Sequence, residues 1–294
     1  MYFVGIDVGG TKSDFLLCDE NENEISRVIL GAGNPNDIGI DKCITLLGEG
    51  LDALCGDITP VAVFAGVSGA GYGEYAVRVR DFLKKRFPNS IIENGPDALN
   101  LIYCSRSKNA GALICGTGSL LFLRVGGKLL RFGGWGHLFD DGGSGYDIGR
   151  DALRHLLDCE ERMPSLLNTP LCSLLRARLS SSAHDSIADF YASGKAYIAS
   201  FAPIAFEAYE SGDEAALTII SANVESVARR IELAIESLAE GEQINEIICA
   251  GGLFNSPVFY AMLAKRVDTP LTLLTVAPSL GACRRAIDLF RENN

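Results

Sequence analysis

DVGGTKS, residues 7–13, lies between two apolar runs near the start of the chain, YFVGIDV (2–8) and DFLLCD (14–19). Two apolar runs joined by a short turn of glycine and small polar residues predict a β-hairpin. Glycine also lets main-chain N–H groups converge on one point with no Cβ in the way, which suits the oxygens of a phosphate. The turn therefore has two readings, a plain hairpin connection and an anion site.

The same arrangement recurs twice further along the chain. CGTGS (115–119) lies between GALIC (111–115) and LLFLRV (120–125), and CAGGLFNS (249–256) continues the apolar run NEIICA (245–250). Each glycine turn thus follows a predicted buried strand. The sequence contains neither a P-loop nor a Rossmann glycine motif, so those two nucleotide-binding folds have no support. Together the three turns favour phosphate binding more than any one of them does.

Composition excludes several classes of protein. The chain has 294 residues, of which 48% are hydrophobic, enough for two domains or one large one. Its net charge of −11 argues against a nucleic-acid surface, which needs a basic stripe. No apolar run approaches the length of a membrane span. The first predicted strand already begins at Tyr2, so we expect no signal peptide.

Nine cysteines are scattered along the chain, an odd number with no C-x-x-C pair. This pattern favours reduced thiols in a cytoplasmic protein over a disulfide framework or a zinc site. We expect the cysteines to serve as small buried apolar residues.

Strands and helices are mixed along the chain, which predicts an α/β fold of two related lobes. The Ser-rich stretch RLSSSAHDS (178–186) is expected to separate the first long helical segment from the rest. Besides the two hairpins and the strand before the third turn, strands are expected at 61–67, 90–94 and 271–276. Helices are expected at 74–87, from 97, at 147–160, 184–193, 195–211 and 213–240, after 256, and from 279.

The three turns, in this order and spacing, resemble the nucleotide-binding loops of the BadF/BadG/BcrA/BcrD superfamily of actin-like ATPases, and within it the N-acetylglucosamine kinase branch. GWGHLFDDGGSGYDIGR (134–150) and YESGDEAA (209–216) are similar to further signatures of that family. The resemblance runs over nearly the whole chain. It implies two actin-like (ribonuclease H-like) lobes, with nucleotide and sugar bound in the cleft between them.

The resemblance also implies where the lobes divide and what each turn binds. The N-terminal lobe would comprise residues 1–109 and the C-terminal lobe 110–278, with a last helix at about 279–294 packing back onto the N-terminal lobe. The first two turns are similar to phosphate loops and the third to an adenosine loop, with ATP and Mg²⁺ as the implied cofactors. The residues expected to contact the nucleotide are Gly9, Gly10, Thr11, Lys12, Gly116, Thr117, Gly118, Ser119, Gly251, Gly252 and Asn255.

Two aspartates are the candidates for the chemistry. Asp97, in NGPDALN (94–100), lies at a predicted strand-to-helix turn, where an aspartate can accept a proton or simply cap the helix. The family's catalytic base occupies this place, which favours the first role. Asp7 ends a buried strand, and an unpaired buried carboxylate is costly, so Mg²⁺ or its water shell is the expected partner. Lys12 is expected either beside the phosphates or exposed on its turn.

The stretch RFGGWGHLFDDGGSG (131–145) has glycine at six of its fifteen positions, as expected where a ligand must come close to the backbone. The side chain of Trp135 has a second reading as a core residue, and His137 is expected to be a hydrogen-bonded scaffold residue. By the resemblance, the residues that contact an amino sugar are Gly134, Trp135, Asp141 and Gly145 on this lobe, with Asn34, Asn36 and Ser68 on the other.

One motif departs from the family. Its members commonly read G-D-E-G-S where this chain reads DDGGS (140–144). Aligning Asp141 places Gly142 where the family has glutamate and Asp140 where it has glycine. If the glutamate bonds to the sugar, its loss loosens or shifts the choice of substrate, with Asp140 as a partial substitute. The expected substrates are, in order, N-acetylglucosamine, N-acetylmuramic acid and glucosamine.

We therefore expect a cytoplasmic kinase that transfers the γ-phosphoryl group of ATP to an amino-sugar hydroxyl, O6 by the resemblance. Two other classes are weighed against it: an ATP-driven iron–sulfur activase and a sugar sensor without catalysis. An activase needs thiolates that converge at a dimer axis, and although Cys115 lies near the second turn, no suitably spaced cysteine follows. No nucleic-acid or membrane partner is expected. Amphipathic helices between 184 and 240 offer a surface for a homodimer.

Overall fold

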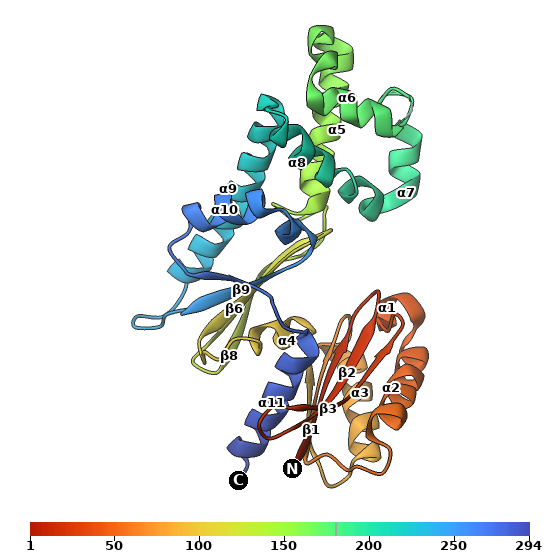
Figure 1. The fold of residues 1–294 in the computed structure, drawn as a ribbon, viewed down its shortest axis with the longest axis vertical. Coiled ribbons are helices and arrows are strands. Elements are labelled where there is room, and N and C mark those ends of the chain that lie inside the picture. The colour runs from red at the N-terminus through yellow and green to blue at the C-terminus, as the bar shows by residue number, and fades with distance from the viewer. Residues whose placement is uncertain (180) are drawn as a thin grey trace. The chain divides into compact units, whose positions relative to one another are not determined.

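The computed structural model describes residues 1–179 and 181–294. Over those residues the chain folds as two compact units, Met1–Lys108 with Leu274–Asn294 and Asn109–Leu273, and each is built on a five-stranded sheet (Figure 1). The fold class is therefore mixed α/β, as the sequence predicts. Residue 180, in the Ser-rich stretch 178–186, lies outside the described residues.

The sheet of the first unit has the strand order β3-β2-β1-β4-β5. Strands β1, β2 and β3 are antiparallel neighbours, whereas β4 and β5 run parallel to β1. Pairing of β1 with β2 places Asp7 opposite Asp14, where β1 leads into the turn 9–12. The bounds are β1 Tyr2–Val8, β2 Ser13–Asp19, β3 Glu24–Leu30, β4 Ala62–Val67 and β5 Ile91–Gly95.

Helices cover both faces of this sheet, because successive side chains of a strand point to opposite sides. Val4 and Ile6 of β1 belong to a core formed with α2 and α3, whereas Phe3 belongs to a core formed with α11. The helices of this unit are α1 Pro35–Ile38, α2 Ile40–Cys55, α3 Gly73–Arg86, α4 Ala98–Ile102 and α11 Pro278–Glu292.

Gly5 lies in β1 where α11 crosses the sheet. A Cβ on Gly5 would lie 2.3 Å from the backbone nitrogen of Cys283 and 2.3 Å from the carbonyl oxygen of Ser279. The contact joins backbone to backbone, so neither partner can move aside as a flexible side chain would. Only a residue without a side chain lets α11 lie this close to the strand.

We expect Gly5→Ala to lower the free energy of unfolding by about 3 kcal/mol, the upper end of the usual cost of overpacking. Urea unfolding followed by circular dichroism measures this loss. The control is Gly31→Ala, because a Cβ at Gly31 would meet nothing within 4 Å. An equal loss in both variants would show that the approach of α11 to β1 imposes no such constraint.

The sheet of the second unit has the order β10-β9-β6-β7-β8. Its central strand β6 pairs antiparallel with β7, which pairs antiparallel with β8, whereas β9 and β10 run parallel to β6. Both sheets therefore share one pattern of neighbours, as expected for two related lobes. The bounds are β6 Ala110–Cys115, β7 Ser119–Val125, β8 Lys128–Gly133, β9 Glu246–Ala250 and β10 Leu271–Leu273.

The helices of the second unit form two groups. Helices α9 and α10 pack on the sheet, and α5 to α8 enclose a second core beyond it (Figure 1). No helix of the described residues is long and apolar enough to cross a membrane. The bounds are α5 Gly145–Arg162, η1 Pro164–Asn168, α6 Pro170–Leu179, α7 Ile187–Ala199, α8 Ala202–Glu210, α9 Glu214–Glu236, η2 Gly252–Asn255 and α10 Pro257–Arg266, where η marks a 3₁₀ helix.

The sequence prediction lacks the short helices α1, η1 and η2, the helices α2 and α6, and the strands β3 and β8. Both strands lie at a sheet edge and have mostly exposed or half-exposed residues, so they lack the apolar run that marks a buried strand. The strand expected at 271–276 ends at Leu273, and α6 reaches Leu179, inside the stretch expected to separate helices.

Candidate active site

Asp7 is a partly buried carboxylate at the end of β1. Its Oδ1 accepts a hydrogen bond of 2.6 Å from Asn100 Nδ2, and Asn100 Oδ1 has no hydrogen-bond partner among the described residues. Burial raises the pKa of Asp7 to about 6; the bond from Asn100 opposes this rise, and the charge of Asp97 adds to it. Carboxylate and amide oxygens are the ligands that Mg²⁺ prefers. This donor set therefore fits the cation expected at Asp7.

The turn after β1 is fixed by main-chain bonds. Gly9 N donates to Lys12 O at 2.9 Å, and Gly33 N donates to Gly9 O at 3.0 Å. The side chains of Thr11 and Lys12 are exposed, so they are free of the core and available to a ligand. The turn is thus rigid in its backbone while its polar side chains face solvent.

Asp97 is the N-cap of α4, and its Oδ1 accepts a bond of 3.0 Å from Ala98 N. Burial raises the pKa of Asp97, against the lowering by the Ala98 N–H and by the Ser68 hydroxyl, which donates to the carboxylate. Capping and proton acceptance are therefore compatible here, because a carboxylate has lone pairs beyond those used by the cap.

Two asparagines lie beside the loop that carries Ser68. Asn34 Oδ1 caps α1 by accepting from Asn36 N at 3.0 Å. A Cβ on Gly69, next to Ser68, would lie 2.2 Å from Asn34 Oδ1 and 2.5 Å from Asn36 Nδ2. A Cβ on Gly71 would lie 2.7 Å from Pro96. The loop after β4 therefore brings the predicted residues Asn34, Asn36, Ser68 and Asp97 together.

In the second unit, the second and third glycine turns pack against each other. A Cβ on Gly251, where φ is 106°, would lie 2.4 Å from the carbonyl oxygen of Cys115. Gly145, the first residue of α5, donates from its N–H to Gly116 O at 2.7 Å. The three segments that the sequence analysis singled out in this unit therefore form one contiguous backbone surface, with Gly252 and Asn255 exposed beside it.

Asp141 forms an ion pair with Lys195, and its Oδ1 accepts a bond of 3.4 Å from Ser119 N. The Asp141 side chain is only 3% exposed. A Cβ on Gly118 would lie 2.9 Å from Lys195 Nζ, so the ammonium group is directly beside the second turn. Sequence reasoning missed Lys195, whose one local signal is its position after Gly194, a residue with φ of 73° inside α7.

Arg230 of α9 holds the loop before α5. Its guanidinium donates to Ser119 Oγ at 2.7 Å, to Gly142 O at 3.1 Å and to Asp140 Oδ1 at 3.0 Å. Asp140 is therefore paired inside the unit, which argues against its substituting for the missing glutamate. A Cβ on Gly142 would lie 2.3 Å from Ser226 Oγ, so α9 occupies the space that a larger residue would need.

Trp135 is 62% exposed, so its reading as a core residue is wrong. The Arg131 guanidinium lies 4.2 Å from the ring centroid and donates to Gly134 O at 2.6 Å, which orders this loop. His137 is exposed and packs against the ring of Tyr146 at 4.9 Å, a different setting from the hydrogen-bonded scaffold expected. The loop thus presents an aromatic face and backbone groups to solvent.

A cavity of about 480 Å³ lies between α5 and α7. Arg150, Arg154 and Lys195 line it, each paired with an aspartate, and Tyr146 and Tyr191 bring aromatic rings with hydroxyl groups. Lys195 belongs both to this lining and to the ion pair with Asp141, so the cavity adjoins the predicted sugar-binding carboxylate.

Asp7→Asn is expected to flatten the dependence of stability on pH. The folded protein binds the Asp7 proton more tightly than the unfolded chain, because the pKa rises from 3.8 to about 6. The stability contributed by the protonated Asp7 carboxyl group is therefore complete below about pH 4, and it is lost as the pH rises through about 6. Without metal, the variant should be more stable than the wild type at pH 7 by roughly 3 kcal/mol.

Urea unfolding at several pH values, in the presence of a chelator, measures this difference. The exposed Asp57→Asn serves as the matched control and should leave the pH dependence unchanged. An identical slope between pH 4 and 6 in wild type and Asp7→Asn would contradict the assignment.

Lys195→Met is expected to destabilise the protein by about 3 kcal/mol, because it leaves the buried Asp141 carboxylate unpaired. Thermal and urea unfolding measure this loss. The double variant Lys195→Met/Asp141→Asn removes both charges and should recover most of the stability. If the double variant were as unstable as the single one, lost packing and not the ion pair would explain the effect.

Comparison with known proteins finds a match to one family and two relatives that align with most of this chain. Residues 4–276 match the BadF/BadG/BcrA/BcrD ATPase family. An N-acetyl-D-glucosamine kinase of Dictyostelium discoideum is 27% identical over 316 residues, which cover 97% of this chain and 98% of the relative. An N-acetylmuramic acid/N-acetylglucosamine kinase of Clostridium acetobutylicum is 27% identical over 266 residues, which cover 87% of this chain and 86% of the relative.

Solved structures share the fold. A candidate N-acetylglucosamine kinase of Chromobacterium violaceum has a TM-score of 0.73 at 18% identity, with 98% of each chain covered. A ROK hexokinase of Thermus thermophilus has a TM-score of 0.61 at 14% identity, with 100% of this chain and 99% of the other covered. At these identities the likeness establishes the fold, which is that of actin-like sugar kinases.

Proposed function

The chain belongs to the BadF/BadG/BcrA/BcrD ATPase family, and on that premise we propose that it is an ATP-dependent amino-sugar kinase. It transfers the γ-phosphoryl group to a hydroxyl, O6, of N-acetylglucosamine. One observation carries the proposal: Asp97 is a buried carboxylate of raised pKa that accepts from the Ser68 hydroxyl, and Asn34 and Asn36 lie against Gly69, the residue after Ser68. The names of the two relatives support the same substrate class.

Asp97 is the general base of the reaction. A sugar hydroxyl is a weak nucleophile, so it must be held in line with the phosphoryl group while its proton is accepted. Burial raises the pKa of Asp97, which makes it a better proton acceptor near neutral pH than an exposed aspartate. The Ala98 N–H and the Ser68 hydroxyl fix the carboxylate, so that a free lone pair faces the sugar.

The nucleotide is assigned to the three glycine turns. Gly9, Gly10, Thr11 and Lys12 in one unit, and Gly116 to Ser119 in the other, bind the phosphates mainly through main-chain N–H groups. Gly251, Gly252 and Asn255 hold the adenosine. Asp7 and Asn100 Oδ1 would hold Mg²⁺, directly or through water, and the cation when bound neutralises charge on the phosphate oxygens. Lys195 adds a positive charge beside Gly118.

The sugar is assigned to residues of both lobes, 1–109 with the last helix and 110–278. Asn34, Asn36 and Ser68 are its proposed contacts in the first lobe. Gly134, Trp135, Asp141 and Gly145 bind it from the other, with Lys195 holding Asp141 in place. Because Gly142 leaves the family's glutamate position without a side chain, we expect weaker discrimination among amino sugars, glucosamine included.

N-acetylmuramic acid is the second candidate substrate. Its lactyl group carries a carboxylate, and the cavity beside Lys195 is lined by Arg150 and Arg154. Arginine binds carboxylates with two parallel hydrogen bonds. Arg150 is already paired with Asp147 and Asp151, so the more exposed Arg154 is the group of this lining that supports a substrate with an anionic substituent, in keeping with the name of the Clostridium acetobutylicum relative.

The proposed setting is cytoplasmic, with ATP and a small sugar as the partners. All nine cysteines are free thiols in the part of the chain that the structure describes, which supports a reducing compartment. A homodimer through the helices between 184 and 240 stays a prediction.

Asp97→Asn is expected to lower kcat by about 10²–10⁴-fold, the usual contribution of a general base. Asparagine still caps a helix, so the variant should fold and bind ATP as the wild type does. ADP release from Mg-ATP measures turnover with N-acetylglucosamine, N-acetylmuramic acid, glucosamine and glucose.

The exposed Asp81→Asn is the control and should keep full activity. Turnover of N-acyl sugars that is lost only in Asp97→Asn supports the proposal. Full activity in Asp97→Asn would remove Asp97 from the mechanism, and no sugar-dependent turnover in the wild type would contradict the kinase assignment.

A further inference from the structure

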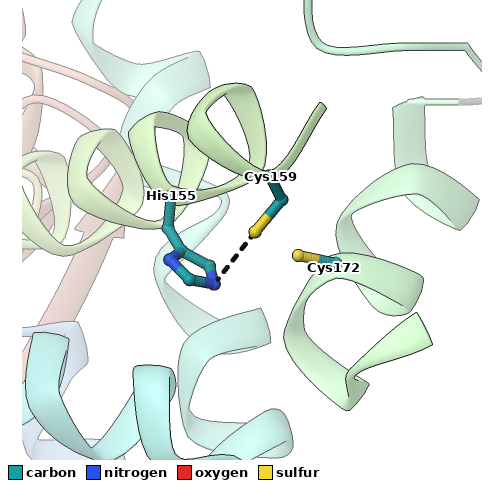
Figure 2. A group of neighbouring side chains, drawn as sticks. All are labelled: His155, Cys159 and Cys172. Atoms are coloured by element: carbon teal, nitrogen blue, oxygen red, sulfur yellow. Dashed lines mark hydrogen bonds between the residues drawn. The ribbon is translucent and has the colours of Figure 1, made fainter. Parts of the chain in front are cut away.

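Three soft or borderline metal ligands meet in the helical core of the second unit. His155 and Cys159 of α5 and Cys172 of α6 point toward one another (Figure 2). The His155 Nε2 and Cys159 Sγ atoms are 3.5 Å apart, and all three ligand atoms lie within 4.8 Å of one another. No other group of three such residues is present in the described part of the chain. None of the three takes part in the proposed kinase site.

The backbone fixes these positions. His155 and Cys159 are four residues apart on one helix, so their side chains lie on the same face of α5. Cys172 is in the first turn of α6, and the start of that helix is held by Asp213, whose Oδ2 accepts from Leu171 N at 2.9 Å. Asp213 is itself the N-cap of α9. The third ligand is therefore anchored independently of the other two.

The spacing matches that of a tetrahedral zinc site. With Zn–S near 2.3 Å and Zn–N near 2.0–2.1 Å, ligand atoms around one zinc ion are about 3.3–3.8 Å apart. The observed 3.5 Å between His155 Nε2 and Cys159 Sγ falls within that range. The Cys172 Sγ atom lies within 4.8 Å of the other two ligand atoms, so an approach of about 1 Å completes the set.

We propose that His155, Cys159 and Cys172 form a binding site for Zn²⁺ that ties α6 to α5. Two thiolates and an imidazole select a thiophilic cation, whereas Mg²⁺ and Ca²⁺ prefer oxygen ligands. Both cysteines are fully buried, but His155 is half-exposed, so the fourth position is open to water from the histidine side.

Binding releases two protons, because both cysteines must become thiolates. Burial and the adjacent Cys172 thiol together raise the pKa of the Cys159 thiol to about 12, so this thiol is protonated in the free site. Zinc affinity should therefore increase with pH. Helix α5 runs from this site to Gly145, which bonds to Gly116 of the second glycine turn. The cation thus stabilises the helix that supports the phosphate-binding segment.

The test titrates Zn²⁺ into the reduced, chelator-treated full chain in competition with a chromophoric chelator. We expect one Zn²⁺ per chain with a dissociation constant on the order of micromolar or tighter, and a rise in Tm. Cys159→Ser and Cys172→Ser should each weaken binding at least about 100-fold, since even outer-shell changes cost 10–100-fold. The control Cys55→Ser, a buried thiol of the first unit, should bind as the wild type does.

Two further measurements keep the outcome clear if a cysteine variant folds poorly. His155→Gln changes a half-exposed residue, so it should fold normally and still weaken binding. Co²⁺ gives a thiolate-to-metal absorption band whose intensity should fall by about half when one of two thiolates is removed.

Absence of stoichiometric Zn²⁺ binding by the wild type would overturn the proposal. Wild-type affinity in both His155→Gln and one of the two single cysteine variants would also overturn it. If mild oxidation instead joins Cys159 to Cys172 while the reduced protein binds no Zn²⁺, the pair is a redox couple and the zinc site is wrong.

Discussion

In each unit, the backbone of one segment packs directly against the backbone of another, with no side chain between them. Helix α11 lies against β1 only because Gly5 has no Cβ, and the third glycine turn lies against Cys115 only because Gly251 has none. The first contact lies in the middle of β1 and serves packing, whereas the second lies at the end of β6, beside the turns proposed to bind the nucleotide. In such a turn no side chain keeps a ligand away from the backbone N–H groups. Gly251 therefore serves packing and, in the proposed function, ligand binding.

Buried charge is the second constraint, and the candidate site residues of the two units satisfy it differently. In the first unit Asp7 and Asp97 are held by neutral donors, so burial raises the pKa of both carboxyl groups. In the second unit Asp141 is paired with Lys195, and Asp140 with Arg230. A carboxylate of raised pKa suits proton transfer and metal binding, whereas a paired one suits a fixed hydrogen-bond acceptor. The two units thus carry different parts of the chemistry.

The departure from the family at DDGGS has a structural explanation. Ser226 fills the space where a side chain on Gly142 would lie, and Arg230 bonds to both neighbours of that position, Asp140 and the Gly142 carbonyl. Helix α9 therefore orders this loop.

Local sequence determined the glycine turns, the buried strands that precede them, and the family. These features are short and depend on residue type alone: apolar runs, positions without a Cβ, an aspartate at a strand end. Only the tertiary structure placed Lys195 beside Gly118, Arg230 beside Ser119, and Cys172 beside His155 and Cys159. Such partners are separated by tens of residues or lie on different helices, and helix packing, which no local pattern encodes, decides which side chains meet. The edge strands β3 and β8 were missed for a related reason, since what makes them strands is their neighbour in the sheet.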